Sequence, residues 1–148
     1  MKKCFAVCIL SLFVCSFTQA QDSLFLRKEF IFNGDTLRYR VLFPDNYSKN
    51  KKYPLVIFLH GSGECGNDNE KQLVHGASLF EDQKNRTNFP SIVIFPQCPA
   101  TDTWVNYKDT GPNTFEFIDC KKPTKALELT KTLIDFYKKT EAVDKKRI

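Results

Sequence analysis

The stretch FLHGSGECG, residues 58–66, places Ser62 between two glycines directly after an apolar run. A serine in such a setting suggests the nucleophile of an esterase. That nucleophile sits in a Gly-x-Ser-x-Gly turn, where small residues two positions before and after it relieve crowding. The corresponding positions here hold His60 and Glu64, and no other serine of the chain has the flanking glycines. We therefore expect no nucleophilic serine in this chain.

A second interpretation is a dinucleotide-binding loop, because Gly61, Gly63 and Gly66 satisfy Gly-x-Gly-x-x-Gly after an apolar run. That motif should open a helix and should be followed by an acid at the end of the next strand. Here Asn67-Asp68-Asn69 follows the loop, and the next apolar run ends in Phe95-Pro96-Gln97. We expect no nucleotide cofactor.

The third interpretation concerns the backbone of the loop. Ester hydrolysis passes through a tetrahedral oxyanion, which preorganised N–H donors about 3 Å away stabilise. In α/β-hydrolases one such donor comes from a loop that follows an early central strand. Glycine lets such a loop approach the substrate without a Cβ clash. The backbone N–H of Ser62, flanked by Gly61 and Gly63, is therefore the candidate catalytic group, and its hydroxyl is incidental.

The elements that must position this loop begin with a hairpin. Two segments rich in β-branched and aromatic residues, 24–32 and 36–43, flank Asn33-Gly34-Asp35, which favours a tight turn and antiparallel pairing. Leu55–Leu59 and Ile92–Phe95 are continuous apolar runs, typical of strands buried on both faces.

Helices are predicted between and after these runs. A short helix is expected over Glu70–Phe80, and a long one from Pro123 to about Thr140; residues 97–122 read as mostly loop. Buried strands that alternate with helices indicate an α/β fold whose mostly parallel sheet is covered on both faces. Asp144–Ile148 resembles the lead-in to a further strand.

The stretch Tyr53–Glu64 resembles the esterase branch of the α/β-hydrolase fold. This branch holds exported phospholipase/carboxylesterase-like and polyhydroxybutyrate-depolymerase-like esterases, also known as prolyl-oligopeptidase-like peptidases. The resemblance extends from about Phe30 to the C-terminus, and further matching blocks are Gly66–Leu73, Phe95–Pro99, Trp104-Val105 and Val143–Ile148.

The resemblance implies roles for individual residues. His60, Gly61 and Gly63 would shape the oxyanion loop, and the Ser62 N–H would be the donor. Glu64 and Gln97-Cys98-Pro99 would lie near the mouth of the site. Trp104 would line an acyl or alcohol pocket, or alternatively pack its loop onto the sheet.

In that family the segment matching Asp144–Ile148 leads directly into the Gly-x-Ser-x-Gly turn, and the acid and histidine of the triad come later. None of these has a counterpart here. We therefore expect the N-terminal portion of an α/β-hydrolase domain, truncated before the nucleophile. It would belong to a carboxylic-ester hydrolase of the serine type that is inactive as given, and the substrate would be a small-molecule or polysaccharide ester. The alternatives are a non-catalytic envelope protein that binds through the same cleft, and a peptidase of the same fold.

The first twenty residues predict export. Lys2 and Lys3 precede an uncharged apolar stretch, and Thr18-Gln19-Ala20 offers a cleavage site. Cleavage would leave one domain, residues 21–148, in the periplasm or secreted, without a transmembrane segment.

The formal charge of +5 is spread along the chain, so we expect no nucleic-acid partner. Cleavage would leave Cys65, Cys98 and Cys120. Their spacing does not suggest a metal site. An exported chain permits one disulfide among them, but the sequence does not choose the pair and does not fix the oligomeric state.

Overall fold

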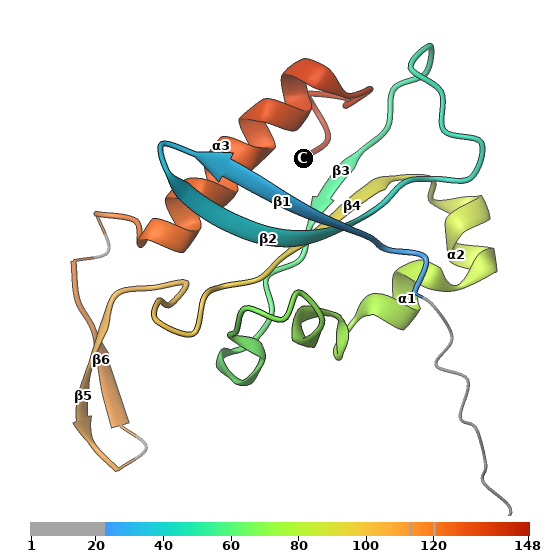
Figure 1. Ribbon diagram of the computed structural model, residues 1–148. Coiled ribbons are helices and arrows are strands. Elements are labelled where there is room, and N and C mark those ends of the chain that lie inside the picture. The colour runs from blue at the N-terminus through green and yellow to red at the C-terminus, as the bar shows by residue number, and fades with distance from the viewer. Residues whose placement is uncertain (1–22, 113, 120) are drawn as a thin grey trace, which may run out of the picture.

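The computed structural model describes residues 23–112, 114–119 and 121–148. The predicted signal peptide, residues 1–20, and Cys120 lie outside the described residues. The described chain is built on a sheet in the order β1-β2-β4-β3 (Figure 1). These strands are β1 (Leu26–Phe32), β2 (Asp35–Leu42), β3 (Leu55–Ile57) and β4 (Ile92–Pro96). β2 pairs antiparallel with β1 and β4, whereas β3 runs parallel to β4.

The predicted hairpin is confirmed. Phe32 pairs with Asp35 across the turn, and the two residues between them have positive φ, 53° at Asn33 and 86° at Gly34. Asparagine and glycine tolerate these angles better than other residues, and two successive positive φ values match the twist of the flanking strands. The Asn-Gly pair thus sets the register of β1 on β2.

β4 is buried on both faces, as its continuous apolar sequence predicts. Ile92 and Ile94 pack with the cluster that includes Leu37 and Val41, and Val93 and Phe95 pack on the opposite face. The same prediction was wrong for residues 55–59. β3 ends at Ile57, and Leu59 is 41% exposed. Among the described strands β3 pairs with β4 alone, and Leu59 lies in the loop beyond the end of β3.

The predicted long helix is confirmed as α3 (Lys125–Thr140). Its N-cap is Thr124, one residue after Pro123, and the Thr124 hydroxyl accepts the Leu127 N–H at 3.3 Å. Figure 1 shows α3 lying across one face of the sheet. Its buried face consists of Ala126, Leu129, Thr130, Leu133 and Tyr137.

The opposite face is covered by shorter pieces. The prediction of a single helix over Glu70–Phe80 was wrong, because the structure has a 3₁₀ turn, η2 (Lys71–Leu73), and then α1 (Ala77–Glu81). Gly76 lies between them with φ of 84°, a left-handed conformation that ends helical geometry. A further helix, α2 (Gln83–Asn88), begins at an Asp82 cap whose carboxylate accepts the Asn85 N–H.

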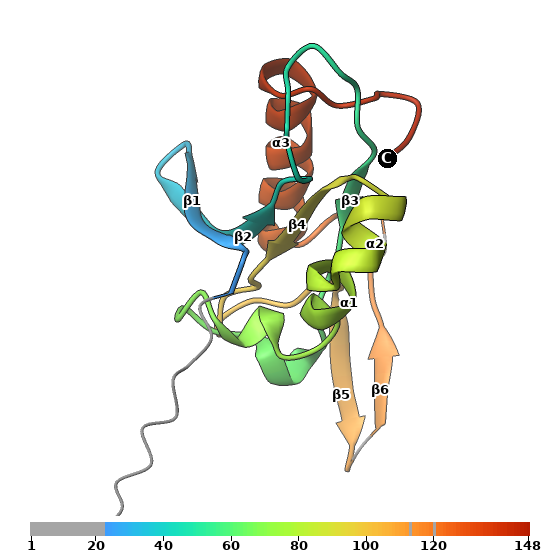
Figure 2. The ribbon, with the colours of Figure 1, turned by 90° about the vertical axis from the view of Figure 1, so that its right-hand side faces the viewer.

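Residues 97–122 also contain structure that the sequence did not predict. β5 (Tyr107–Gly111) and β6 (Thr114–Phe117) form a second, separate hairpin. Figure 2 shows it extending away from the main sheet.

The segment after α3 returns to β3. Val143 forms a parallel bridge with Tyr53, and the Leu55 N–H donates to the Arg147 carbonyl at 3.0 Å. These two contacts place residues 143–147 beside the start of β3. That the segment leads into a further strand stays a prediction. Among the described helices, none combines the length and the apolar character that crossing a membrane requires.

Candidate functional site

The site residues named from the sequence gather at one edge of the sheet. The candidate oxyanion loop, residues 58–66, follows β3, and Gln97-Cys98-Pro99 follows β4. Because β3 and β4 are parallel, both segments leave the sheet at the same edge, where α/β proteins commonly bind ligands. The Gly66 N–H donates to the Cys98 carbonyl at 2.9 Å and joins the two segments.

The Ser62 backbone lies at the start of a 3₁₀ turn, η1 (Ser62–Glu64). Gly61, the N-cap, is extended, with φ of −79° and ψ of 175°. The first N–H groups of a helical turn have no partner inside the turn. In the part of the chain that the structure describes, no acceptor is bonded to the N–H of Ser62 or of Gly63, and both residues are exposed. Two neighbouring donors are thus available to an outside oxygen.

His60 is buried, 5% exposed, and both of its ring nitrogens are occupied. Nε2 accepts the Cys98 N–H at 2.9 Å, which assigns the proton to Nδ1. Nδ1–H then donates to the Gly61 carbonyl at 2.6 Å. In this arrangement His60 fixes the loop and is not free to act as a base.

Trp104 packs against the same residue. Its indole N–H donates to the His60 carbonyl at 3.0 Å, and the two ring centroids are 5.2 Å apart. These contacts agree with the second of the two roles considered for Trp104, packing its loop onto the rest of the protein. The side chain is half-buried, so a lining role for its remaining surface stays a prediction.

The Glu64 carboxylate folds back over the start of the loop. A Cβ added at Gly61 would lie 3.1 Å from Glu64 Oε2, whereas nothing lies within 4 Å of one added at Gly63. Glu64 Oε1 lies 3.6 Å from His75 Nε2. The Glu64 carboxylate thus lies close to Gly61, the residue before the two candidate donors.

Gln97 supports the far end of the loop, a role that sequence reasoning missed. Its side chain is 1% exposed. Oε1 accepts the Asn69 N–H at 2.7 Å, and Nε2 donates to Asp68 Oδ1 at 2.8 Å and to the Glu64 carbonyl at 3.3 Å. The only signal in the sequence is an amide directly after a fully apolar strand.

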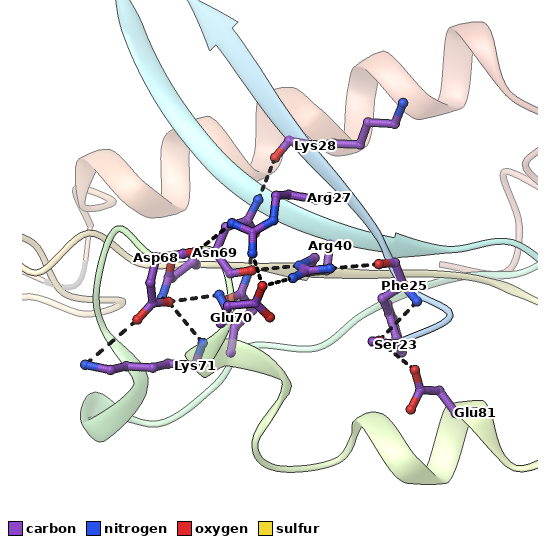
Figure 3. Close-up of polar contacts among 12 residues, drawn as sticks. Ser23, Phe25, Arg27, Lys28, Arg40, Asp68, Asn69, Glu70, Lys71 and Glu81 are labelled. Carbon is purple, nitrogen blue, oxygen red and sulfur yellow. Dashed lines mark hydrogen bonds and ion pairs between the residues drawn. The ribbon is translucent and has the colours of Figure 1, made fainter. Parts of the chain in front are cut away.

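Asp68 stabilises the turn that leads into η2. Its Oδ1 accepts the N–H groups of Glu70 at 2.8 Å and Lys71 at 3.0 Å (Figure 3). The hydrogen bond from the Lys71 backbone, with that from Gln97, holds the pKa of the Asp68 carboxyl below its ordinary value despite partial desolvation.

Two arginines tie this turn to the first hairpin. Arg40 is 7% exposed and donates to the Asn69 carbonyl at 2.7 Å and to the Phe25 carbonyl at 2.9 Å. Arg27 donates to the Asp68 carbonyl at 2.8 Å, and both arginines form ion pairs with Glu70, as Figure 3 shows. Burial lowers the pKa of Arg40, but an arginine remains charged at neutral pH.

Within residues 23–112, 114–119 and 121–148, no three His, Cys, Asp or Glu side chains gather closely enough to hold a metal ion.

No protein-family model matches this sequence, and no curated protein matches it. Among solved structures, the chain is similar to a thermostable esterase, with 30% sequence identity and a TM-score of 0.71 over 84% of this chain. It is also similar to a ferulic acid esterase from Anaeromyces mucronatus in complex with ferulic acid, with 18% identity and a TM-score of 0.51. The same esterase without substrate gives 17% identity and a TM-score of 0.50.

These matches cover only part of the known esterases. The chain spans 33% of the length of the thermostable esterase and 44% of that of the ferulic acid esterase. The similarity to the ferulic acid esterase is a similarity of fold alone, whereas the similarity to the thermostable esterase includes the sequence. The described chain therefore has an esterase-like α/β-hydrolase fold.

Proposed function

We propose that this chain provides the oxyanion loop of a serine-type carboxylic-ester hydrolase, with the Ser62 N–H as donor and the Gly63 N–H beside it. The observation that carries the proposal is the pair of exposed, unbonded N–H groups at the edge where β3 and β4 end. The His60 contacts to Gly61 and Cys98 support it, because a donor must be held in place before the reaction to stabilise developing charge.

The chemistry assigned to this chain is electrostatic. When a nucleophile attacks the carbonyl carbon of an ester, the carbonyl oxygen becomes an anion, and the two N–H groups would donate to that oxygen. The nucleophile, its base and its acid are assigned to no residue here. His60 is committed to the loop, and the His75 side chain is 72% exposed on the surface. We expect the 148-residue chain alone to show no triad-type ester turnover.

The substrate class is part of the proposal. Esterases are the solved proteins that this fold is similar to, which favours a carboxylic ester of a small molecule or of a polysaccharide. Export to the periplasm or the medium, which rests on residues 1–20, would give the protein access to polysaccharide. A peptidase of the same fold stays an alternative, because fold does not determine chemistry.

A second candidate is non-catalytic binding at the same edge of the sheet. The β5–β6 hairpin, which extends away from the main sheet, offers a further binding surface, since Tyr107, Phe115 and Phe117 are 42%, 58% and 59% exposed. Their rings form a contiguous group, with centroids 6.0 Å and 5.3 Å apart. Exposed aromatic rings are suited to stacking on a flat apolar ligand.

The test compares two replacements of Ser62 that differ in the backbone N–H. Ser62→Pro deletes the donor at the first position of η1, where proline is tolerated, and the extended Gly61 is compatible with a following proline. Ser62→Ala keeps the N–H and removes the hydroxyl. In the protein as the cell makes it, we expect Ser62→Pro to lower the kcat for a nitrophenyl ester by about 10²–10³-fold and Ser62→Ala to leave it unchanged.

Three outcomes would contradict the proposal. Loss of activity in Ser62→Ala would make the hydroxyl the nucleophile, and equal activity in both variants would remove the oxyanion role. Absence of any ester turnover by a native protein that continues past Ile148 into a Gly-x-Ser-x-Gly segment would favour binding. Mass spectrometry of the native protein, searching for peptides beyond Ile148 that carry Gly-x-Ser-x-Gly, identifies the nucleophile independently.

A further inference from the structure

Cys65 and Cys98 lie side by side where the oxyanion loop meets the end of β4. Cys65 directly follows η1, and Cys98 is the second residue after β4. The hydrogen bond of 2.9 Å from Gly66 N–H to the Cys98 carbonyl brings the two main chains together. Cys65 also lies close enough to Cys98 to contribute to the raised pKa of the Cys98 thiol.

The two thiols differ in access. Cys98 is fully buried, with 0% exposure, whereas Cys65 is partly exposed. The structure records both as free thiols. A disulfide needs two Cα atoms about 4.4–6.8 Å apart, and the main-chain bond of Gly66 to Cys98 brings Cys65, the neighbour of Gly66, beside Cys98.

We propose that Cys65 and Cys98 form a disulfide that ties the oxyanion loop to the end of β4. The inference is independent of the ester chemistry, because it rests on the two cysteines and their main-chain contact. It chooses one pair among three cysteines that sequence alone leaves open.

The bond forms by exchange with a small disulfide, such as oxidised glutathione. The Cys65 thiolate attacks one sulfur of the oxidant, which releases one thiolate and leaves a mixed disulfide on Cys65. The Cys98 sulfur then attacks Cys65 Sγ, releases the second thiolate and gives its proton to water. Two protein thiols are oxidised, and one oxidant disulfide is reduced to two thiols.

The order of these steps follows from the surroundings of the two sulfurs. Burial, together with the neighbouring Cys65, raises the pKa of the Cys98 thiol, so Cys98 is poorly reactive toward reagents in solution. The accessible Cys65 therefore reacts first, and the buried Cys98 completes the bond from within the fold. We expect formation to be slow, because the second step requires the Cys98 thiolate.

The bond would also stabilise the fold. It closes the chain between residues 65 and 98, which limits the unfolded ensemble. For a loop of this length, reduction of the bond should lower the Tm by about 10 °C.

Trypsin places the three cysteines in separate peptides, residues 53–71, 87–108 and 109–121. The test is to incubate the native protein with oxidised glutathione, alkylate it under denaturing conditions without reductant, digest it and identify linked peptides. We expect a link between 53–71 and 87–108, with Cys120 alkylated. Three alkylated cysteines, or a link that includes 109–121, would overturn the proposal.

A pair of variants provides a second readout. Cys65→Ser should abolish the link and make the Tm insensitive to reductant, whereas Cys120→Ser should keep both the link and the fall in Tm on reduction. The opposite pattern, with sensitivity lost in Cys120→Ser, would also overturn the proposal. The peptide map of the unmodified protein decides the matter even if a variant does not fold.

Discussion

The imidazole of His60 accepts the backbone N–H of Cys98 at 2.9 Å and so joins the loop after β3 to the loop after β4. The two residues are far apart in sequence, but the parallel pairing of β3 with β4 brings the ends of these strands together. The same ring donates to the Gly61 carbonyl directly before the candidate donors. One buried side chain thus holds the main chain directly before Ser62 and Gly63.

Replacing His60 should destabilise the protein. His60→Asn is too short to reach Cys98, so a buried N–H loses its acceptor, which costs about 1–3 kcal/mol in the free energy of unfolding. Urea denaturation measures the change. His75→Asn is the matched control, since the His75 side chain is 72% exposed, and it should change stability by less than about 0.5 kcal/mol. Equal effects of the two variants would contradict the structural role of His60.

The sequence predicted the parts of the fold that depend on local signals. Asn33-Gly34 predicted the hairpin, because few residues other than asparagine and glycine adopt the positive φ angles of its turn. The apolar period of residues 125–140 predicted α3, because one face of that helix packs on the sheet. These signals lie within a few residues of the element that they specify.

Other features depend on contacts between distant segments and could not be predicted from local signals. The bonds of Gln97 to Asn69 and Asp68 arise only once β4 lies beside β2 and β3. The β5–β6 hairpin was missed because its strands are short and exposed, and polar residues interrupt the apolar pattern of Tyr107, Phe115 and Phe117. The candidate oxyanion loop follows β3 at the edge where β4 also ends, and its role stays a prediction.

Replacing Gly76 by a residue with a side chain should destabilise the protein for two reasons. It has φ of 84°, and a Cβ at this position would lie 2.8 Å from Phe58 Cζ. The left-handed conformation alone costs a residue with a side chain about 1–2 kcal/mol. We expect Gly76→Ala to lower the free energy of unfolding by at least about 1 kcal/mol, measured by urea denaturation.

Gly63→Ala is the control for this prediction, because nothing lies within 4 Å of a Cβ there. Adding Phe58→Leu to Gly76→Ala should recover part of the loss if the clash with the ring contributes. A Gly76→Ala variant as stable as the parent would show that the turn between η2 and α1 is not constrained in this way.

The stability of the protein should depend on both the shape and the charge of the side chain at position 97. Gln97→Met keeps the volume but leaves the buried Asn69 N–H without an acceptor, which should cost about 1–3 kcal/mol. Gln97→Glu keeps an acceptor for Asn69 but places a carboxylate against Asp68 Oδ1, which lies 2.8 Å from the present amide nitrogen. Like charges at this distance repel, so Gln97→Glu should be more destabilising at pH 7 than at pH 4.

Urea midpoints of both Gln97 variants at the two pH values test this prediction. Lys84→Met serves as the control, since Lys84 is exposed on α2. A Gln97→Glu variant whose stability loss is the same at pH 4 and pH 7 would exclude the proposed contact with Asp68.

Asp68 should make the stability of the fold depend on acid pH. Its backbone hydrogen bond from Lys71 and its side-chain bond from Gln97 lower its pKa below the ordinary value of 3.8. The unfolded chain therefore binds more protons than the folded chain between these two pKa values, and stability rises with pH there. The contribution is fully present above the ordinary pKa and is lost as the pH falls through the lowered one.

Asp68→Asn tests this dependence. Urea midpoints between about pH 2 and pH 7 should show a smaller slope in the variant than in the parent. The slope should not vanish, because the carboxyls of Asp45, Asp135 and Asp144 also have lowered pKa values, caused by bonds to Arg86, Lys131 and the Lys146 backbone respectively. Asp109→Asn, on the exposed β5 strand, is the matched control and should keep the parent slope. If Asp68→Asn also kept the parent slope, the Asp68 carboxylate would not stabilise the turn that follows the candidate oxyanion loop. The Gln97 amide would then have to hold that turn through its bond to Asn69 alone.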